Sequence, residues 1–259
     1  MRLTTLGDAC LDVIVRLEAA LALGDDQSAR SVILPGGQAA NVAAWAASLG
    51  AQARFVGRLG DDAAGELLAW ALAERDVERC GPAGGRTAVV VSLATGGDRT
   101  MASDRGDAPQ LSPADLDPAW FDCDVLHVSG YALLVDPIAG AAEAAAAHAR
   151  AHGAQVTLDV STATLVDDAF RARARALAPE LVFATEREQQ ALGALDTRWV
   201  LKRGARGLHV DGRDHPALDT DVVDTTGAGD ALAAGFLVGG PELGLEAAAR
   251  CCARVGAMP

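Results

Sequence analysis

Cysteine is scarce in this sequence, and its positions do not have the spacing of a metal site. The cysteines are odd in number and scattered, which is typical of reduced thiols in the cytosol. No apolar run is both long enough and free enough of charge to cross a membrane, and the N-terminal residues lack the pattern of a secretory signal. We therefore expect a cytoplasmic protein that does not insert into membranes. The five cysteines are Cys10, Cys80, Cys123, Cys251 and Cys252.

Positive charge is also in short supply. The chain carries 22 lysine and arginine residues against 35 aspartate and glutamate residues, which gives a formal net charge of −13. Nucleic acids and anionic membranes are bound by basic surfaces, so both kinds of partner are disfavoured. If the chain binds a nucleotide, local backbone amides, a few cations and Mg²⁺ must neutralise its phosphates.

The 259 residues, half of them hydrophobic, are enough for one α/β domain with a full core. Short strand-like runs alternate with helical runs, which predicts a mostly parallel central sheet flanked by helices on both faces. We expect a single domain over 1–259, because no linker or internal repeat interrupts the pattern. The expected strands lie at 2–7, 53–56, 125–129, 156–160, 181–184 and 199–201, and the expected helices at 41–49, 63–75, 138–152 and 245–254.

The N-terminal third departs from this alternation. Its strands are half polar and have few helices between them. The segments near 11–18, 30–35 and 87–104 are therefore expected to form a small separate sheet. Within the last of these segments, two strand-like runs flank a glycine-rich turn at 96–98 and predict a β-hairpin.

The most informative stretch of the chain is Asp224-Thr225-Thr226-Gly227-Ala228-Gly229-Asp230. An alanine-rich apolar run follows it, which predicts a tight turn that opens a buried helix. The first turn of a helix has unpaired N–H groups and a positive dipole end, and small residues let an anion approach them. Asp230 then lies where a carboxylate reaches the group that attacks a bound phosphate, which favours phosphoryl transfer. The alternative is that Asp230 only complements the helix dipole.

A second glycine-rich stretch, Pro35-Gly36-Gly37-Gln38-Ala39-Ala40-Asn41, precedes another expected helix. Paired glycines let the backbone come close to a ligand. Asn41 offers both a donor and an acceptor at the start of the helix, which suits neighbouring hydroxyl groups. Taken alone, the stretch is equally typical of a loop in which Asn41 is the N-cap.

In this order and at this separation, the two stretches resemble the two signatures of the PfkB, or ribokinase-like, carbohydrate kinases. The resemblance extends over nearly the whole chain. It implies a ribokinase-like fold in which the small β-sheet is a lid over the sugar site. It also implies that Asp230 is the catalytic base, that Gly227, Ala228 and Gly229 form an anion hole, and that ATP and Mg²⁺ are the cofactors.

The resemblance further assigns residues to the substrate. In the family, an Asp at the position of Asp12 grips sugar hydroxyls, and Asp8 is a second candidate, with turn chemistry as the alternative for both. Arg105 would reach the substrate or stabilise phosphoryl charge, with a solvated lid position as the alternative. Ribokinases carry an Asn and a Lys at the positions of Cys10 and Gln38, so ribose itself is not well supported. The implied substrate-binding residues are Asp8, Asp12, Gly36, Gly37, Gln38, Asn41 and Arg105.

On the nucleotide side, the stretch Leu201-Lys202-Arg203-Gly204-Ala205-Arg206-Gly207 resembles the family's strand-end loop. Lys202 or Arg203 would neutralise phosphate charge there, and a glycine hairpin with solvated cations is the alternative. Thr185 and Glu188 fall on the family's Asn-x-x-Glu motif, which is tied to Mg²⁺ through water, and a solvated helix charge is the alternative for Glu188. The implied nucleotide-binding residues are Lys202, Gly204, Gly207, Thr185, Thr225 and Thr226, with Glu188 as a metal ligand through water.

The expected activity is ATP-dependent phosphorylation of a hydroxyl group of a sugar or sugar-like substrate. The first alternative is a nucleoside kinase of the same fold. It is disfavoured because aromatic residues, which stack on bases in such kinases, make up only 4% of the chain and are missing from the expected lid strands. The second alternative is a non-catalytic sugar or nucleotide sensor, which Thr185 and the chain end at Pro259 suggest.

Two further expectations concern ions and partners. The chain ends at the start of the loop that helps to bind a monovalent cation in the family, so K⁺ binding is left open. In some relatives the lid strands pair across two chains. Because an exposed lid sheet has edges that need covering, we expect a homodimer through the lid.

Overall fold

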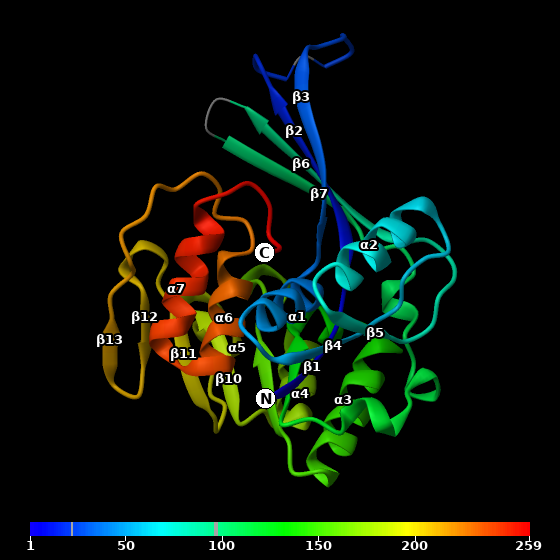
Figure 1. The fold of residues 1–259 in the computed structure, drawn as a ribbon, viewed down its shortest axis with the longest axis vertical. Coiled ribbons are helices and arrows are strands. Elements are labelled where there is room, and N and C mark those ends of the chain that lie inside the picture. Colours follow the sequence, from blue (N-terminus) through cyan, green and yellow to red (C-terminus); the bar gives the residue numbers. More distant parts are fainter. Residues whose placement is uncertain (22, 96–97) are drawn as a thin grey trace.

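A nine-stranded sheet forms the centre of the molecule (Figure 1). The computed structural model describes residues 1–21, 23–95 and 98–259. The strand order is β13-β12-β11-β10-β9-β8-β1-β4-β5. The strands from β11 to β5 run parallel, and β12 and β13 extend the sheet in antiparallel fashion. The strands are β1 (Arg2–Leu6), β4 (Gln52–Val56), β5 (Val77–Cys80), β8 (Val125–Ser129), β9 (Gln155–Asp159), β10 (Leu181–Thr185), β11 (Arg198–Lys202), β12 (Leu208–Val210) and β13 (Arg213–His215).

Helices cover both faces of this sheet, as the sequence predicts. One face packs against α1, α2, α6 and α7 around Trp45 and Phe183, and the other packs against α3, α4 and α5 around Leu126 and Phe170. Within the described residues, none of the helices combines the length and the apolar character that a membrane span requires. The helices are α1 (Gln38–Ser48), α2 (Ala63–Ala73), α3 (Ile138–Ala151), α4 (Asp168–Leu177), α5 (Glu186–Leu192), α6 (Ala228–Gly239) and α7 (Pro241–Cys252).

The alanine-rich helix α3 shows how the composition builds these layers. Alanine has the highest helix propensity, so the run folds as a helix without a strongly polar face. Ala141, Ala142, Ala145 and Ala149 recur at intervals of three and four residues and are fully buried. Their small side chains let α3 lie close to β8 and β9.

A second, four-stranded sheet rises from the body of the molecule (Figure 1). We call it the small sheet, and its strand order is β3-β2-β6-β7. The segments predicted to form it supply all of its strands, so the expectation of a small separate sheet is confirmed. The turn predicted at Gly96 and Gly97 lies outside the described residues. The strands are β2 (Cys10–Leu17), β3 (Ala29–Gly36), β6 (Ala88–Thr95) and β7 (Asp98–Asp104).

The elements that differ from prediction lie at helix starts and sheet edges. Helix α1 begins at Gln38, three residues before Asn41, because Gly37 is its N-cap; the interpretation of Asn41 as the N-cap is wrong. Strands β5, β12 and β13 were not predicted from the sequence. They are edge or near-edge strands of only three or four residues, and β5 and β13 are rich in charge, so they lack the apolar pattern of a buried strand.

Candidate active site

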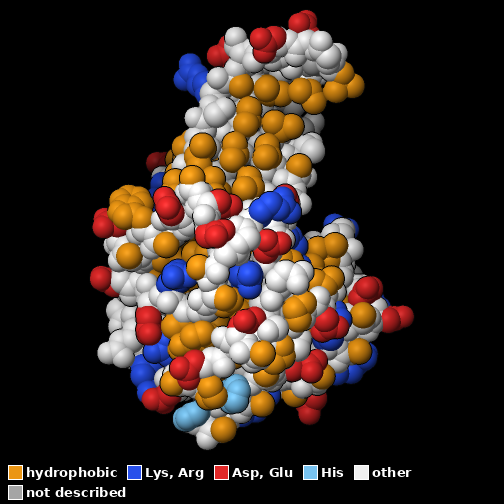
Figure 2. Space-filling view, turned by 90° about the vertical axis from the view of Figure 1, so that its right-hand side faces the viewer, with side chains coloured by type: hydrophobic (Ala, Val, Ile, Leu, Met, Phe, Trp, Pro, Cys, Tyr) orange, Lys and Arg blue, Asp and Glu red, His pale blue; other side chains and the backbone are white. Residues whose placement is uncertain are grey.

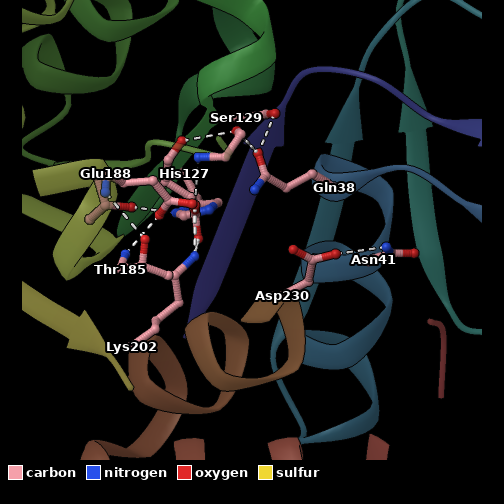
Figure 3. Close-up of polar contacts among 11 residues, drawn as sticks. Gln38, Asn41, His127, Ser129, Thr185, Glu188, Lys202 and Asp230 are labelled. Atoms are coloured by element: carbon pink, nitrogen blue, oxygen red, sulfur yellow. Dashed lines mark hydrogen bonds and ion pairs between the residues drawn. The ribbon is translucent and has the colours of Figure 1, made fainter. Parts of the chain in front are cut away.

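Two helices begin side by side, and their first turns carry the two glycine-rich motifs (Figure 3). Helix α1 starts after Gly37 and helix α6 after Gly227, with φ angles of 99° and 77° that favour glycine. A Cβ atom on Gly37 would lie 2.5 Å from Ala9 Cα, and one on Gly227 would lie 2.5 Å from Ala257 Cβ. Both helix starts therefore depend on glycine to pack closely against neighbouring segments.

A hydrogen bond joins the two motifs. Asn41 Nδ2 donates to Asp230 Oδ2 at 2.7 Å (Figure 3). A carboxylate only accepts, so this contact fixes the Asn41 amide with its nitrogen towards Asp230. The other amide atom, Asn41 Oδ1, is buried and has no hydrogen-bond partner among the residues that the structure describes. Since buried acceptors are nearly always paired, Oδ1 is a ready acceptor for a ligand hydroxyl.

The surroundings of Asp230 favour its protonated form. Burial raises the pKa of Asp230 to about 7. The hydrogen bond from Asn41 and the charge of Lys202 lower this pKa, and the carboxylates of Asp159 and Asp12 raise it. A carboxylate whose pKa lies near neutral pH is suited to accept a proton from a substrate and to release it afterwards.

The nearest histidine does not compete for this role. His127 is fully buried on β8, where its Nδ1 bonds to Thr157 Oγ1 at 2.8 Å (Figure 3). Burial lowers the pKa of His127 to about 4, so its ring is neutral at pH 7. A neutral ring that is fully buried within the sheet is a poorer candidate for a base than the carboxylate of Asp230.

Lys202 is the only lysine of the chain and lies at the end of β11. Its Nζ donates to Asp159 Oδ1 at 2.9 Å and to Oδ2 at 2.6 Å. Burial opposes the charge of Lys202, but Asp159 and Glu188 outweigh it and raise its pKa. A Cβ atom on Gly229 would lie 3.5 Å from Nζ, so this ammonium group stands beside the first turn of α6. Cation and helix N-terminus together form a site for an anion.

A cavity of about 670 Å³ opens beside this ammonium group, and we call it the Lys202 cavity. Most of the predicted nucleotide-binding residues line it: Thr185, Lys202, Gly204, Gly207 and Thr225. The first turns of α6 also line it, through Ala228, Gly229 and Leu232. Other walls come from a loop before α6 and from α7, and these were not predicted from the sequence because they are mostly small or apolar. They include Ala217, Leu218, Asp219, Thr220, Val222, Leu245, Ala248, Ala249 and Cys252.

Thr226 is the predicted nucleotide-binding residue that does not line the cavity. Its N–H and its hydroxyl both bond to Asp224 Oδ1, at 3.0 Å and 2.7 Å, so the side chain stabilises the turn before α6. In the same turn the Ala228 N–H donates to Thr225 O at 3.2 Å. This bond must open for Ala228 to take part in the predicted anion hole.

Thr185 and Glu188 form a capping box at the start of α5. Glu188 Oε2 accepts from the Thr185 N–H at 2.7 Å, and Thr185 Oγ1 accepts from the Glu188 N–H at 3.2 Å (Figure 3). Glu188 is buried, so the solvated charge considered from sequence is wrong. The Thr-x-x-Glu pattern is itself a signal for this cap. Across the described ranges, three or more His, Cys, Asp or Glu side chains are nowhere grouped to hold a metal ion.

On the substrate side, Arg105 binds Asp8. Arg105 Nη2 lies 3.0 and 2.9 Å from the two Asp8 oxygens, and Nε lies 3.1 Å from Oδ2. Arg105 Nη2 also donates to Tyr131 O at 3.0 Å. The pair joins the end of the small sheet to the turn after β1. Two residues predicted to bind the substrate separately therefore bind each other.

Asp12 and Gly36 lie together where β2 pairs with β3. A Cβ atom on Gly36 would come within 2.2 Å of Asp12 Oδ2, so glycine at this position leaves room for the Asp12 carboxylate. Gln38, the first residue of α1, bonds through Oε1 to the hydroxyl groups of Ser129 and Ser161. The structure thus gathers the residues predicted to bind the substrate around the start of α1.

The model of the pfkB family carbohydrate kinases matches residues 2–258 of the chain. The chain belongs to this family. A fructokinase from Klebsiella pneumoniae is 31% identical over 92% of this chain and 84% of the relative. An ATP-dependent ribose-1-phosphate kinase from Halopiger xanaduensis is 32% identical over 97% of this chain and 90% of the relative.

Solved structures agree with this assignment. The adenosine kinase from Sinorhizobium meliloti superposes with a TM-score of 0.86 at 27% identity, covering 100% of this chain and 95% of that one. A putative ribokinase II from E. coli in complex with ATP and Mg²⁺ has the same fold, with a TM-score of 0.84 at 20% identity over 99% of this chain and 94% of that one. The ribokinase-like fold and the class of phosphotransferase that acts on an alcohol group are therefore confirmed.

Replacing the partly buried carboxylate of Asp230 should stabilise the protein at high pH. The folded-state pKa of Asp230, about 7, lies above the ordinary value of 3.8, so the carboxylate destabilises the fold increasingly as pH rises from 4 to 7. At pH 8 we expect Asp230→Asn to raise the free energy of unfolding by about 1–3 kcal/mol, and the gain should vanish towards about pH 4. Denaturant titrations at both pH values measure it.

The matched control is Asp221→Asn, an exposed carboxylate in the loop before α6. Its free energy of unfolding should stay within about 0.5 kcal/mol of wild type at both pH values. A variant at Asp230 that is no more stable than wild type at pH 8 would contradict the burial penalty described above.

Proposed function

We propose that this chain transfers the γ-phosphoryl group of ATP to a hydroxyl group of an uncharged sugar, with Asp230 as general base. The observation that carries the proposal is the position of Asp230. Its carboxylate lies between the Lys202 cavity and the unpaired acceptor of Asn41, and its pKa is raised to about 7 by burial. All five cysteines are free, which supports a cytoplasmic location.

In this proposal each of these groups has a task. Asn41 Oδ1 accepts a hydrogen bond from the sugar and orients it, and Asp230 takes the proton from the attacking hydroxyl. Lys202 and the first turn of α6, at Gly227 and Gly229, hold the phosphates and neutralise their charge. When bound, ATP would supply the phosphoryl group and Mg²⁺ would neutralise phosphate charge, with Glu188 holding the ion through water. The small sheet, as a lid, excludes water from the reaction.

Electrostatics on the substrate side favour an uncharged substrate. The guanidinium of Arg105 is already bound on two sides by the carboxylate of Asp8. After burial, the charges of Asp159 and Asp12 add to the rise in the pKa of Asp230, so two further carboxylates act on this site. A sugar acid or sugar phosphate would add a further negative charge next to these groups, and like charges at such distances repel.

A nucleoside is the second candidate, and Tyr131 favours it. Tyr131 is the only tyrosine of the chain and follows β8. Burial raises the pKa of Tyr131, and the carboxylates of Asp230 and Asp8 add to this effect, so the phenol lies near the substrate residues. An aromatic ring there offers a stacking surface for a base. The sensor hypothesis has no support once the chain is placed in a phosphotransferase family.

A panel of acceptors tests the proposal. The protein with MgATP should convert a neutral hexose or pentose to its phosphate, and should act on sugar acids and sugar phosphates far more slowly. Formation of ADP and of the phosphorylated product measures the reaction. Asp230→Asn should lower kcat by about 10²–10⁴-fold, the range lost with a general base, while Asp221→Asn should keep wild-type activity.

Three outcomes decide between the candidates. Preference for a nucleoside over every sugar supports the second candidate. A phosphorylated or carboxylated acceptor as the best substrate contradicts the uncharged class. Near-normal turnover by Asp230→Asn contradicts the assignment of the base.

We further propose that a second copy of the chain covers one face of the small sheet. Residues at alternate positions and opposite one another in the register share a face: Val13, Val15, Ile33, Val91 and Leu93. Asp12 lies on the other face. Figure 2 shows hydrophobic side chains in a band over the small sheet, and Ile33 keeps 55% of its surface exposed. An exposed band of this kind marks an interaction surface.

Sedimentation at micromolar concentration tests this dimer. Wild type should sediment as a dimer, and Ile33→Asp should sediment as a monomer, because the charge would be buried in the interface. The melting temperature of the monomeric variant at low protein concentration should match that of wild type. A wild-type protein that is monomeric throughout this range would exclude the dimer.

A further inference from the structure

A chain of polar contacts beside Asp230 joins the Lys202 cavity to the substrate side (Figure 3). It runs from Lys202 to Asp159, then to Ser161, to Gln38 and to Ser129. Asp159, Ser161 and Ser129 lie in neither glycine-rich motif, and none of them is among the site residues predicted from the sequence. We call these five residues the bridging network.

Asp159 is the centre of the bridging network. Its side chain is 1% exposed at the end of β9. Both of its oxygens accept from Lys202 Nζ, and Oδ1 also accepts from the Ser161 N–H at 3.0 Å. A buried carboxylate needs such partners, and removing one leaves an uncompensated charge. The contact with Lys202 and the contact with Ser161 therefore depend on the same group.

Ser161 has an unusual backbone conformation. Its φ angle is +74°, in the left-handed region, where a residue other than glycine is strained by about 1–2 kcal/mol. The N–H bond to Asp159 helps to hold this conformation. In it, Ser161 Oγ donates to Gln38 Oε1 at 2.6 Å. Backbone strain that is held in place by side-chain contacts next to a reaction centre points to a role in positioning.

The Gln38 amide is held in one orientation. Its Oε1 accepts from Ser129 Oγ at 2.5 Å and from Ser161 Oγ at 2.6 Å. In this orientation each serine hydroxyl donates to the amide oxygen, which accepts both bonds. The amide nitrogen, in Figure 3, points away from both serines. The Gln38 nitrogen is then a donor directed from the start of α1, the element that also carries Asn41.

We propose that Asp159 is a positioning residue that sets the Lys202 ammonium group on the nucleotide side and, through Ser161, the Gln38 amide on the substrate side. This inference rests on the proposed function. One buried carboxylate thereby fixes a phosphate-binding cation and a substrate-facing donor in a single arrangement. As a consequence, the contributions of Gln38 and Lys202 to kcat/KM depend on each other, although the two residues lie on different elements.

Steady-state kinetics of single variants separate the two arms of the bridging network. Ser161→Ala loses the contact with Gln38 but keeps the pair of Asp159 with Lys202, so it should raise KM for the sugar and leave KM for ATP within about twofold. Asp159→Asn should raise both KM values and lower kcat. A residue with only a structural role would not produce this split. Thr164→Ala, an exposed position in the same loop, is the control and should change neither KM beyond about twofold.

A double-mutant cycle then tests the coupling. Gln38→Met keeps the length of the side chain and removes its amide, and should lower kcat/KM for the sugar by about tenfold, within the range of contacts in one network. In the Asp159→Asn background, the Ser161 contact with Gln38 is already weakened while the Ser129 contact remains, and the same change should cost less than about threefold. If Gln38→Met lowers kcat/KM by the same factor in the Asp159→Asn background as in the wild type, the proposal is overturned. An equal effect of Ser161→Ala on both KM values would also overturn it.

A labelling experiment gives a readout that needs no turnover. Lys202 is the only lysine, so an amine-reactive ester can label only this side chain and the N-terminal amine, which peptide mass analysis tells apart. At pH 8, Asp159→Asn should speed the labelling of Lys202 by about tenfold or more, because the ammonium loses its counter-charge and deprotonates more easily. Thr164→Ala should label at the wild-type rate.

The two readouts distinguish the failure of each proposal. If no acceptor is phosphorylated but Asp159→Asn speeds the labelling, the proposed function fails and the positioning of Lys202 stands. If the sugar is phosphorylated but the labelling rate is unchanged and the kinetic losses multiply, the proposed function stands and the role of Asp159 is refuted.

Discussion

The hydrogen bond from Asn41 to Asp230 is the contact on which the site depends. It connects residues 189 positions apart in the chain, and each stands in the first turn of its own helix. The contact forms only because both helices start at a glycine with positive φ that packs directly on a neighbouring segment: Gly37 on the turn after β1, and Gly227 on the residues near Ala257. Glycine in the two motifs is thus a requirement of packing as well as of ligand access.

Once Asp230 is held in this way, the charges around it set its chemistry. Burial alone would keep the carboxyl protonated, whereas Asn41 and Lys202 favour the charged form. The balance leaves the pKa near 7, where a base both accepts and releases a proton readily. The same balance explains why the only lysine of the chain is tied to Asp159: an unpaired ammonium would be desolvated and would also lower the pKa of Asp230 further.

Features encoded in short stretches of sequence were predictable. The Asp224–Asp230 and Pro35–Asn41 stretches specify turns whose conformation depends on local glycine positions, so their place at helix starts and the alternating α/β fold could be predicted correctly. The small sheet was also predictable from short stretches of sequence, because its strands interrupt the alternation of strands and helices. The Thr-x-x-Glu pattern at Thr185 and Glu188 is also typical of a capping box, although a metal role was predicted for it from the sequence.

Features that arise from tertiary contacts were not predictable. Asp159 and Ser161 look like any strand end and loop until β9 places them between Lys202 and Gln38. The pairing of Asp8 with Arg105 depends on the packing of the small sheet on the body, 97 residues apart in the chain. The walls that α7 adds to the Lys202 cavity are small and apolar, which is also the composition of an ordinary core helix. The spacing of residues along the chain does not predict such tertiary contacts.

The dependence of kcat on pH, with MgATP and the best sugar at saturating concentration, tests the central claim most directly. If Asp230 is the base, kcat falls about tenfold per pH unit below about pH 7, and Asn41→Ala, which removes the bond that lowers the pKa, moves this limb to higher pH. A kcat that stays constant from pH 5 to pH 8, or a limb that does not move in Asn41→Ala, would contradict the account.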